Sequence, residues 1–305
     1  MDAVVFGNVT LDVLCYPVEE VPRHDSLTFE RSALGPGGCG SNVAVGLSML
    51  GVPTGLVACL GSDEGAALVR SVWAGAGVDQ RLVRQVPGPT AVSVGLVDRT
   101  AQPRFVHTPN ANAGLTVDAI DVDGLIRAGV RAFHVGGFFV LPGLLDGARL
   151  GTALQALSAA PMLTALDVVH SPRMDDPAPL WPCLPHLDIF LCNRREGRRI
   201  TGEDDPAQIA AALRARGANA VVIKLGDQGC WLSTDKRDER IPAPQIEVID
   251  TTGAGDAFAA GLLAALLEGR DLPDACRAGN AAGARIAQHL GAVAGWFAEA
   301  EPPQA

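Results

Sequence analysis

The residue types best suited to chemistry lie near the C-terminus, where a glycine-containing segment precedes a long apolar run. The segment reads Asp250-Thr251-Thr252-Gly253-Ala254-Gly255-Asp256, and the apolar run extends from Ala257 to Leu267. Small residues at a helix start leave the first backbone N–H groups open to a ligand, and the positive helix end favours an anion. Asp256 at this position would orient or deprotonate an attacking hydroxyl. The segment therefore indicates phosphoryl transfer to an alcohol.

The negative charge of a bound phosphate must be neutralised in another way than in the common phosphate-binding loop. The chain has no Gly-x-x-x-x-Gly-Lys-Ser/Thr string, and its only lysines are Lys224 and Lys236. Backbone amides and a metal must therefore neutralise most of the phosphate charge. We expect Gly253, Ala254 and Gly255 to hold the developing charge together with magnesium, while Asp256 acts as the base.

A second glycine cluster, Gly35 to Gly40, leads into a predicted helix that begins at Asn42. Its Gly-x-Gly-x-x-Gly spacing also matches the dinucleotide-binding fingerprint, which belongs at the first strand-to-helix turn with an acidic residue ending the next strand. Here the cluster follows a later strand, and the next core strand ends in Cys59-Leu60-Gly61. A dehydrogenase is therefore the weaker interpretation. Asn42 offers both a donor and an acceptor to a polyol.

Polar side chains also follow two predicted strands. Asp12 lies just beyond the first strand, where a carboxylate at the edge of a parallel sheet can accept bonds from two neighbouring hydroxyls. Asn193 and Glu196 follow the strand Ile189 to Cys192, and a helical turn would place both on one face toward a nucleotide. The alternatives are a turn cap for Asp12 and a capped, solvated helix start for the second pair.

Length, charge and cysteine content narrow the class of protein. A chain of 305 residues is long enough for one large α/β domain with an appendage. The formal charge of −10 argues against nucleic-acid binding, and no apolar run has the length of a membrane span. Seven cysteines without Cys-x-x-Cys spacing argue against a disulfide framework and a structural zinc site. Because the first residues indicate a strand and not a signal peptide, we expect a cytoplasmic protein.

Strands and helices alternate along the chain, which is typical of a mostly parallel sheet covered on both faces. The predicted strands are Ala3 to Phe6, Gly55 to Leu60, Ala132 to Val135, Leu163 to Asp167, Ile189 to Cys192 and Ala220 to Lys224. The predicted helices are Asn42 to Leu50, Gly65 to Ala76, Ala148 to Ala159, Pro206 to Arg216 and Asp256 to Leu267.

Two pieces interrupt the alternation: Val13 to Leu34, and the pair Ala91 to Val97 and Arg104 to Thr108. Both indicate antiparallel strands and a hairpin. We therefore expect a main domain formed by residues 1–12, 35–86 and 109–305, and a separate β unit, discontinuous in sequence, formed by residues 13–34 and 87–108.

With these elements in place, the chain resembles the ribokinase-like carbohydrate kinases of the PfkB family. The segment Asp250 to Asp256 reads much like the family's C-terminal signature. Other family elements occur in the family's order over nearly the whole chain: Gly7 with Asp12, Gly37-Gly38-Cys39-Gly40-Ser41-Asn42, Gly61-Ser62-Asp63-Glu64-Gly65, Asn193-Arg194-Arg195-Glu196 and Lys224-Leu225-Gly226. The resemblance implies a three-layer α/β sandwich with a mostly parallel central sheet and a small β-sheet lid over the acceptor site. In this family the lid sometimes also forms a homodimer interface.

The resemblance also implies which residues bind the acceptor. Asp12, Gly38 and Asn42 would contact it, and Asn112 is a secondary candidate. Ribokinases and phosphofructokinase relatives often carry a lysine at the position of Cys39, so the chain departs from both subgroups here. A phosphorylated acceptor would need a fixed cationic clamp. We expect the remaining candidates for such a clamp to lie on solvated strand faces: Arg23, Arg31 and Arg104.

The nucleotide and cation contacts follow from the same resemblance. The residues expected near the nucleotide are Asn193, Glu196, Lys224, Gly226 and Asn280. Glu196 would bind Mg²⁺ through water, and Asp250 with Thr252 would lie beside a monovalent cation such as K⁺.

The sequence therefore predicts an ATP-dependent and magnesium-dependent kinase that phosphorylates a primary hydroxyl on a small unphosphorylated sugar. A nucleoside kinase on the same scaffold is the nearest alternative, and it would use lid aromatics such as Phe29 and Phe105 to stack on a base. A non-catalytic sugar or nucleotide sensor is the alternative from a different class. The intact Asp256 and its amide loop argue against the sensor.

Overall fold

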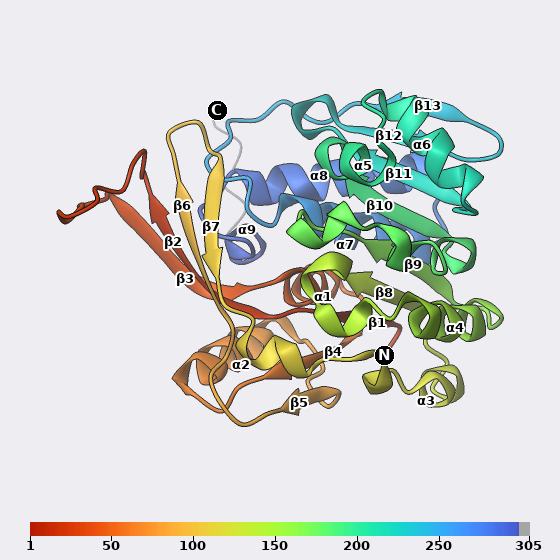
Figure 1. Cartoon of the computed structure of the whole chain (residues 1–305), viewed down its shortest axis with the longest axis horizontal. Coiled ribbons are helices and arrows are strands. Elements are labelled where there is room, and N and C mark those ends of the chain that lie inside the picture. Colours follow the sequence, from red (N-terminus) through yellow and green to blue (C-terminus); the bar gives the residue numbers. More distant parts are fainter. Residues whose placement is uncertain (299–305) are drawn as a thin grey trace.

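The computed structural model describes residues 1–298, which form a three-layer α/β domain and a smaller sheet projecting from it (Figure 1). The central sheet has nine strands. In spatial order they are β13 (Asp238–Ile241), β12 (Cys230–Ser233), β11 (Ala220–Lys224), β10 (Ile189–Asn193), β9 (Leu163–Asp167), β8 (Ala132–Gly136), β1 (Ala3–Gly7), β4 (Thr54–Leu60) and β5 (Val83–Gln85). All neighbours pair in parallel except at β11–β12 and β12–β13, which are antiparallel.

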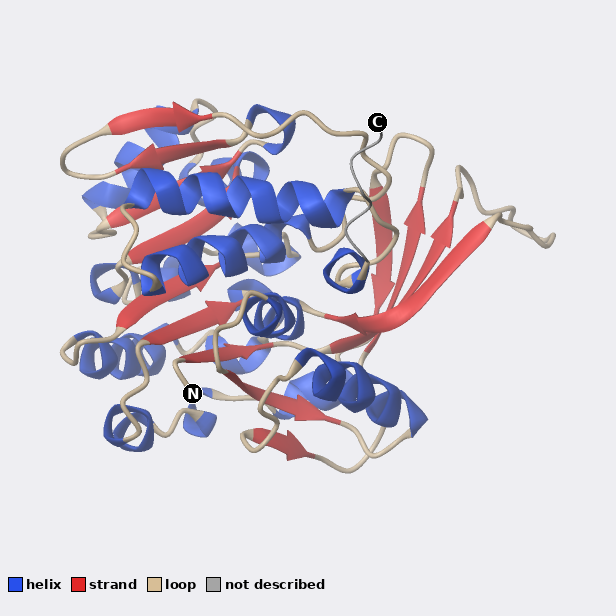
Figure 2. Cartoon of the chain, turned by 180° about the vertical axis from the view of Figure 1, so that it is seen from behind, coloured by secondary structure: helices blue, strands red, loops and turns tan. Residues whose placement is uncertain are grey.

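Helices cover both faces of this sheet, as Figure 2 shows. One face packs against α1 (Cys39–Met49), α2 (Glu64–Ala76), α7 (Ala254–Leu267), α8 (Leu272–Ala287) and α9 (Ala294–Phe297). The other packs against α3 (Val122–Arg127), α4 (Gly147–Ser158), α5 (Arg194–Thr201) and α6 (Pro206–Ala215). Because side chains alternate across a strand, neighbours enter different cores: Ala165 belongs to the first and Leu166 to the second. The strands are apolar on both faces for this reason.

The smaller sheet, which we call sheet B, has the order β3 (Arg31–Gly37), β2 (Thr10–Tyr16), β6 (Val92–Val97) and β7 (Pro103–His107). The β2–β3 and β6–β7 pairs are antiparallel, but β2 and β6 are parallel. Both β2 and β6 leave the main domain outward, so their pairing joins two hairpins in one mixed sheet (Figure 1). The expectation of antiparallel strands therefore holds within each hairpin and not between them.

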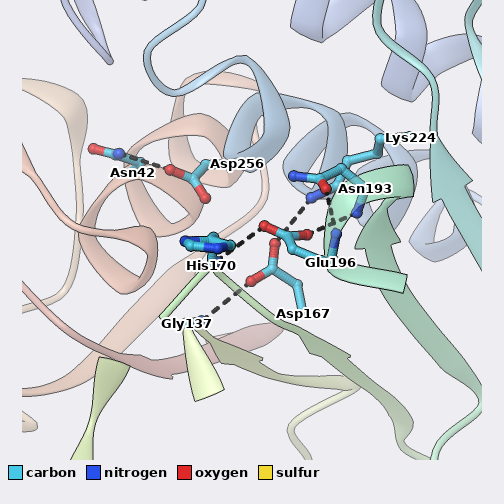
Figure 3. Close-up of polar contacts among 8 residues, drawn as sticks. All are labelled: Asn42, Gly137, Asp167, His170, Asn193, Glu196, Lys224 and Asp256. Carbon is cyan, nitrogen blue, oxygen red and sulfur yellow. Dashed lines mark hydrogen bonds and ion pairs between the residues drawn. The ribbon is translucent and has the colours of Figure 1, made fainter. Parts of the chain in front are cut away.

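The topology brings the carboxyl ends of β1, β8, β9, β10 and β11 to one edge of the central sheet, because these strands are parallel. Loops at that edge of an open α/β sheet commonly bind ligands. Asn42, near the start of α1, and Asp256, near the start of α7, face each other (Figure 3). Within residues 1–298, no helix has the length and apolar character needed to cross a membrane.

Candidate active site

The anion loop at residues 250–256 leads into α7 through a glycine in the left-handed region. Gly253 caps the helix with φ of 77°, and within the described chain no side chain caps this helix end. The Ala254 amide donates to the Thr251 carbonyl at 3.2 Å. Gly255 and Asp256 lie in the first turn, where N–H groups have no acceptor within a helix. The open amides nearest Asp256 are therefore available to an anion.

Asp256 is buried in this first turn and is held by a second helix start. The Asn42 Nδ2 donates to Asp256 Oδ2 at 2.7 Å across 214 residues of sequence (Figure 3). Burial and the Asp167 carboxylate raise the pKa of Asp256 to about 6, while Asn42, Lys224 and the Cys39 thiol act in the opposite direction. A carboxylate with this pKa remains ionised at neutral pH and can accept a proton.

Asn42 lies in the first turn of α1, which begins at Cys39, three residues earlier than predicted. Its Nδ2 is used by Asp256, but its Oδ1 is buried and has no hydrogen-bond partner among residues 1–298. Buried acceptors are usually satisfied, because leaving one unpaired costs about 1–3 kcal/mol. A substrate hydroxyl beside Asp256 would satisfy it.

Asp12 belongs to the same acidic region. Its Oδ1 accepts a hydrogen bond of 2.5 Å from Thr10 Oγ1. Burial raises the pKa of Asp12 to about 7, the Thr10 bond opposes this, and the charges of Asp256 and Asp250 raise it further. Asp12 also lines a cavity of about 180 Å³ between sheet B and the segment 290–297. The cavity is otherwise lined mainly by apolar residues, so Asp12 is its main polar anchor.

Gly38 and Asn112 shape this region through the backbone. Gly38 caps α1 with φ of 84°, and a Cβ there would lie 2.6 Å from the Asn8 carbonyl oxygen. Asn112 pairs with the backbone of Val9, accepting from its N–H at 3.0 Å and donating to its carbonyl at 2.8 Å. Asn112 therefore fixes the connection between β1 and β2, close to Asp12.

A separate cleft of about 200 Å³ begins at the anion loop. It is lined by Lys224, Gly226, Ala254, Gly255, Asn280 and residues of the segments 243–248 and 283–287. Asn280 forms part of its wall, because its Nδ2 donates to the carbonyls of Ile241 and Pro242 at 3.1 Å each. The structure thus brings three of the predicted nucleotide contacts, Lys224, Gly226 and Asn280, to one cleft that ends at the anion loop.

Asn193 and Glu196 form a capping box at the start of α5. Asn193 Oδ1 accepts from the Glu196 N–H at 2.8 Å, and Glu196 Oε2 accepts from the Asn193 N–H at 2.7 Å. The other oxygen accepts from the His170 N–H at 3.2 Å (Figure 3). Burial raises the pKa of Glu196 to about 7, against the opposing charge of Lys224. The capping bonds show that the predicted capped helix start is present. Each carboxylate oxygen of Glu196 still keeps a lone pair for a metal-bound water.

Sequence reasoning missed Asp167 as a site residue and identified it only as the end of β9. Asp167 Oδ2 accepts from Lys224 Nζ at 3.2 Å, and its Oδ1 accepts from the Gly137 N–H at 3.1 Å. The signal was available, because a carboxylate that ends a predicted parallel strand lies at the edge of the sheet where ligands bind. The same argument was applied to Asp12, but the structure places Asp12 inside β2 of sheet B, paired with β3, and not at the end of a parallel strand.

Asp250 lies beneath the anion loop and is fully buried. One oxygen accepts from the Thr252 N–H at 2.9 Å and from the Thr252 Oγ1 at 2.6 Å, and the other accepts from the Gly291 N–H at 2.9 Å. These bonds tie the loop to the segment that follows α8. In residues 1–298 no three His, Cys, Asp or Glu side chains gather as a metal-binding group.

The raised carboxylate pKa values predict how stability depends on pH. The folded protein holds protons on Asp12 and Glu196 up to about pH 7, because their pKa values are raised, whereas in the unfolded chain these carboxyl groups release their protons near their ordinary pKa values of 3.8 and 4.5. Their contribution to stability is therefore present at low pH and is lost as the pH rises through about 7. When the pH is raised from about 5 to about 8, the free energy of unfolding of Asp12→Asn should increase by at least about 1 kcal/mol relative to that of wild type. Urea unfolding at both pH values measures this, and a pH-independent difference would contradict it.

Together, a three-layer α/β fold, a cleft ending at an amide loop and a buried carboxylate at a helix start are the features of a phosphotransferase that acts on an alcohol. The family model described as pfkB family carbohydrate kinase matches residues 2–297. The chain belongs to this family, and it is an ATP-dependent sugar kinase.

Individual relatives cover nearly the whole chain. An ATP-dependent ribose-1-phosphate kinase of Halopiger xanaduensis is 31% identical, with 94% of this chain and 92% of that protein covered. A 2-dehydro-3-deoxygluconokinase of Bacillus subtilis is 28% identical, with 97% and 92% covered. The structure of Arabidopsis thaliana ribokinase complexed with ribose and ATP superposes with a TM-score of 0.82 at 26% identity, covering 96% of this chain and 94% of that one. These relatives differ in their acceptors, so they fix the family and not the substrate.

Proposed function

We propose that this kinase transfers the γ-phosphoryl group of ATP to a primary hydroxyl of a small, unphosphorylated, ribose- or fructose-like sugar. The observation that carries the proposal is the Asn42–Asp256 pair, in which a buried amide oxygen with no partner among residues 1–298 lies beside the base. A polyol supplies two neighbouring hydroxyls to such a pair, one to be deprotonated and one to donate to Asn42 Oδ1. Asp12 would accept from further hydroxyls.

The surroundings of the lid arginines support a neutral acceptor. Arg104 donates to the carbonyls of Val18 and Glu19 at 2.5 and 2.7 Å, and Arg31 stacks over the Tyr16 ring at 4.7 Å. Both guanidinium groups are therefore engaged within sheet B and its loop. A phosphate group on the acceptor would instead meet the acidic pair Asp12 and Asp256, which disfavours an anion.

The residues present fit an indirectly held magnesium ion. Glu196 uses both oxygens for backbone N–H groups, and Asp256 uses one for Asn42, so each carboxylate has lone pairs left for a metal-bound water. Mg²⁺ usually keeps several waters and takes few protein ligands. When bound with ATP, it would neutralise phosphate charge. The chain's own contribution is to orient the hydroxyl through Asn42 and to accept its proton on Asp256.

One observation favours a nucleoside as the second candidate. Paired residues across neighbouring strands share a face of the sheet, so the pairs Leu14↔Gly95 and Gly95↔Phe105 place Phe105 on the face of sheet B that carries Leu14 and Asp12. The Phe105 side chain is 42% exposed and is therefore free to stack on a base.

An acceptor panel tests the proposal. The purified protein, ATP and Mg²⁺ are assayed for acceptor-dependent ADP formation with ribose, fructose, adenosine, pseudouridine, 2-dehydro-3-deoxygluconate, ribose 1-phosphate and fructose 6-phosphate. We expect the highest kcat/KM for a neutral sugar, by at least about tenfold over each phosphorylated sugar. A clear preference for a phosphorylated sugar would contradict it. A preference for a nucleoside that is lost in Phe105→Ala would favour the second candidate, and no ADP formation with any acceptor would favour a sensor.

The ties between Asp250 and the anion loop also support activation by a monovalent cation. A cation beside Asp250 would stabilise its buried charge and hold Thr252 and Gly253 in place for the phosphate. We expect potassium chloride to give at least about twofold higher turnover than tetramethylammonium chloride at the same ionic strength. Equal rates in both salts would exclude a role for the cation.

Three further expectations remain proposals. Sheet B would act as the lid over the acceptor, because its Asp12 face lines the cavity beside segment 290–297. Its outer residues Leu34 and Val106 are 57% and 70% exposed, which suits a homodimer interface. The enzyme would work in the cytoplasm, where its ATP is supplied.

A further inference from the structure

Lys224 is more buried than expected for a residue whose only predicted role is to contact a nucleotide. It ends β11 and lines the nucleotide cleft, yet only 15% of its side chain is exposed. Its ammonium is paired with Asp167, whose side chain is 1% exposed, at 3.2 Å. A buried ion pair at the end of a ligand cleft needs an explanation, because desolvating two charges is costly.

The ammonium also lies directly against the anion loop. A Cβ built on Gly255 would meet Lys224 Nζ at 3.2 Å, closer than any other neighbouring atom. Gly255 is one of the residues whose amides face the expected phosphate. The positive charge of Lys224 is therefore at the loop where negative charge would develop during transfer.

Asp167 is itself rigidly held. Its second oxygen accepts from the Gly137 N–H at 3.1 Å, at the end of the neighbouring strand β8 (Figure 3). Gly137 adopts a left-handed φ of 74°, a backbone shape that aims its N–H toward β9. The carboxylate is thus fixed between two strand ends, and only its Oδ2 is directed to the lysine.

Other carboxylates compete for the same ammonium. Burial alone would lower the pKa of Lys224, but Asp167, Glu196 and Asp256 together raise it, so all three attract the charge. Only Asp167 forms a hydrogen bond with it among the described residues. An ammonium drawn to Asp256 instead would make that base a poorer proton acceptor.

From this geometry we propose that Asp167 is a positioning residue: it holds the Lys224 ammonium beside Gly255, where it stabilises the transferred phosphoryl group, and keeps it away from Asp256. This inference rests on the proposed phosphoryl transfer. It assigns to Asp167 an action exerted through another side chain, so removal of Lys224 should abolish it.

A double-mutant cycle tests the proposal. Asp167→Asn and Lys224→Met are each expected to lower kcat by about tenfold to a hundredfold, since each breaks a charge-assisted interaction. The double variant should be no slower than Lys224→Met alone, because Asp167 has nothing left to position. Multiplying effects in the double variant would overturn the proposal, since Asp167 would then act independently of Lys224. Lys224→Arg should restore part of the turnover when Asp167 is intact and none when it is Asn.

A matched control separates positioning from structural support. Asp188 precedes β10 and accepts from the Thr164 N–H of β9 at 2.8 Å, so it is a carboxylate at the opposite end of the strand that Asp167 terminates. Asp188→Asn should lower the urea midpoint while leaving kcat within about twofold. An equal loss of turnover in Asp188→Asn and Asp167→Asn would assign Asp167 a structural role and overturn the proposal.

Binding of ATP distinguishes this inference from the proposed function. Calorimetric titration with Mg·ATP in the absence of any acceptor needs no turnover. Asp167→Asn and Lys224→Met should each weaken the binding of Mg·ATP by the same factor, about three to thirty. The double variant should bind Mg·ATP no more weakly than either single variant. If no acceptor is phosphorylated but this pattern is found, the positioning role stands and only the acceptor assignment fails. Unchanged ATP affinity together with unchanged turnover in Asp167→Asn would overturn the positioning role.

Discussion

Replacing Asp256 with asparagine should lower kcat by at least about a hundredfold while changing the KM for ATP and for the acceptor little. Asparagine has nearly the same shape and can still interact with Asn42, so the first turn of α7 should remain in place. It cannot accept the proton of the attacking hydroxyl. The interaction lost is made mainly in the transition state, and such a loss lowers kcat and kcat/KM together.

The control for this experiment is the corresponding position in the next helix. Asp274 lies in the first turn of α8, as Asp256 lies in that of α7, but its side chain is 56% exposed. Asp274→Asn should keep turnover within about twofold of wild type. Near-normal turnover of Asp256→Asn with the best acceptor would remove Asp256 from the role of base.

The pH profile gives a second check on the same residue. Since the pKa of Asp256 is raised to about 6, kcat/KM should fall as the pH is lowered through that region, because the base becomes protonated. The residual activity of Asp256→Asn should lack this acid limb. An acid limb that persists unchanged in the variant would assign the limb to another group, such as Glu196.

The helix start at residues 250–256 was within reach of sequence reasoning because its signal is local. The segment Gly253-Ala254-Gly255-Asp256 precedes an apolar run. This order of residues predicts a helix start without any information from the rest of the chain. The predicted strand Ala220 to Lys224 is found with the same bounds, because its first four residues are apolar and buried. The central architecture followed from such segments, since alternating strands and helices allow few arrangements.

Two features that escaped prediction lack a local signal. β13 reads Asp238-Glu239-Arg240-Ile241 and forms only by pairing with β12, so its polar composition indicates a loop. The pairing of β2 with β6 joins segments about eighty residues apart, and their parallel direction follows from the shared exit from the main domain.

The partners within the site were hidden for the same reason. Asp167 and Lys224 are 57 residues apart, and Asn42 and Asp256 are 214 apart. Three neighbouring strands, β9, β10 and β11, each end in a polar residue, and only the order of strands decides which residues meet. The sequence therefore predicts which side chains are available at the edge of the sheet, and the fold decides their pairing.

The second large effect is expected at Gly253, where alanine should lower kcat by about a hundredfold. The residue has φ of 77°, which an L-amino acid adopts at a cost of about 1 kcal/mol. The added Cβ would also lie 2.5 Å from the Ala292 carbonyl oxygen and 2.7 Å from its Cα. These are backbone atoms, so the anion loop itself must move. A displacement of about 1 Å at a reacting centre can reduce turnover by about a hundredfold.

Gly269 separates the two causes, because it follows the other end of α7. Its φ is 85°, but a Cβ there would meet no atom of the described residues within 4 Å. Gly269→Ala therefore introduces the backbone strain without the contact, and should lower the free energy of unfolding by about 1 kcal/mol with kcat within about twofold of wild type. If Gly253→Ala and Gly269→Ala lose stability equally and both keep full turnover, the close approach of Ala292 does not fix the anion loop. Backbone strain is the same in the two variants, and only Gly253→Ala adds a close contact. A loss of turnover in Gly253→Ala alone, in protein that is folded at the assay temperature, would therefore show that phosphoryl transfer requires the anion loop in its present position.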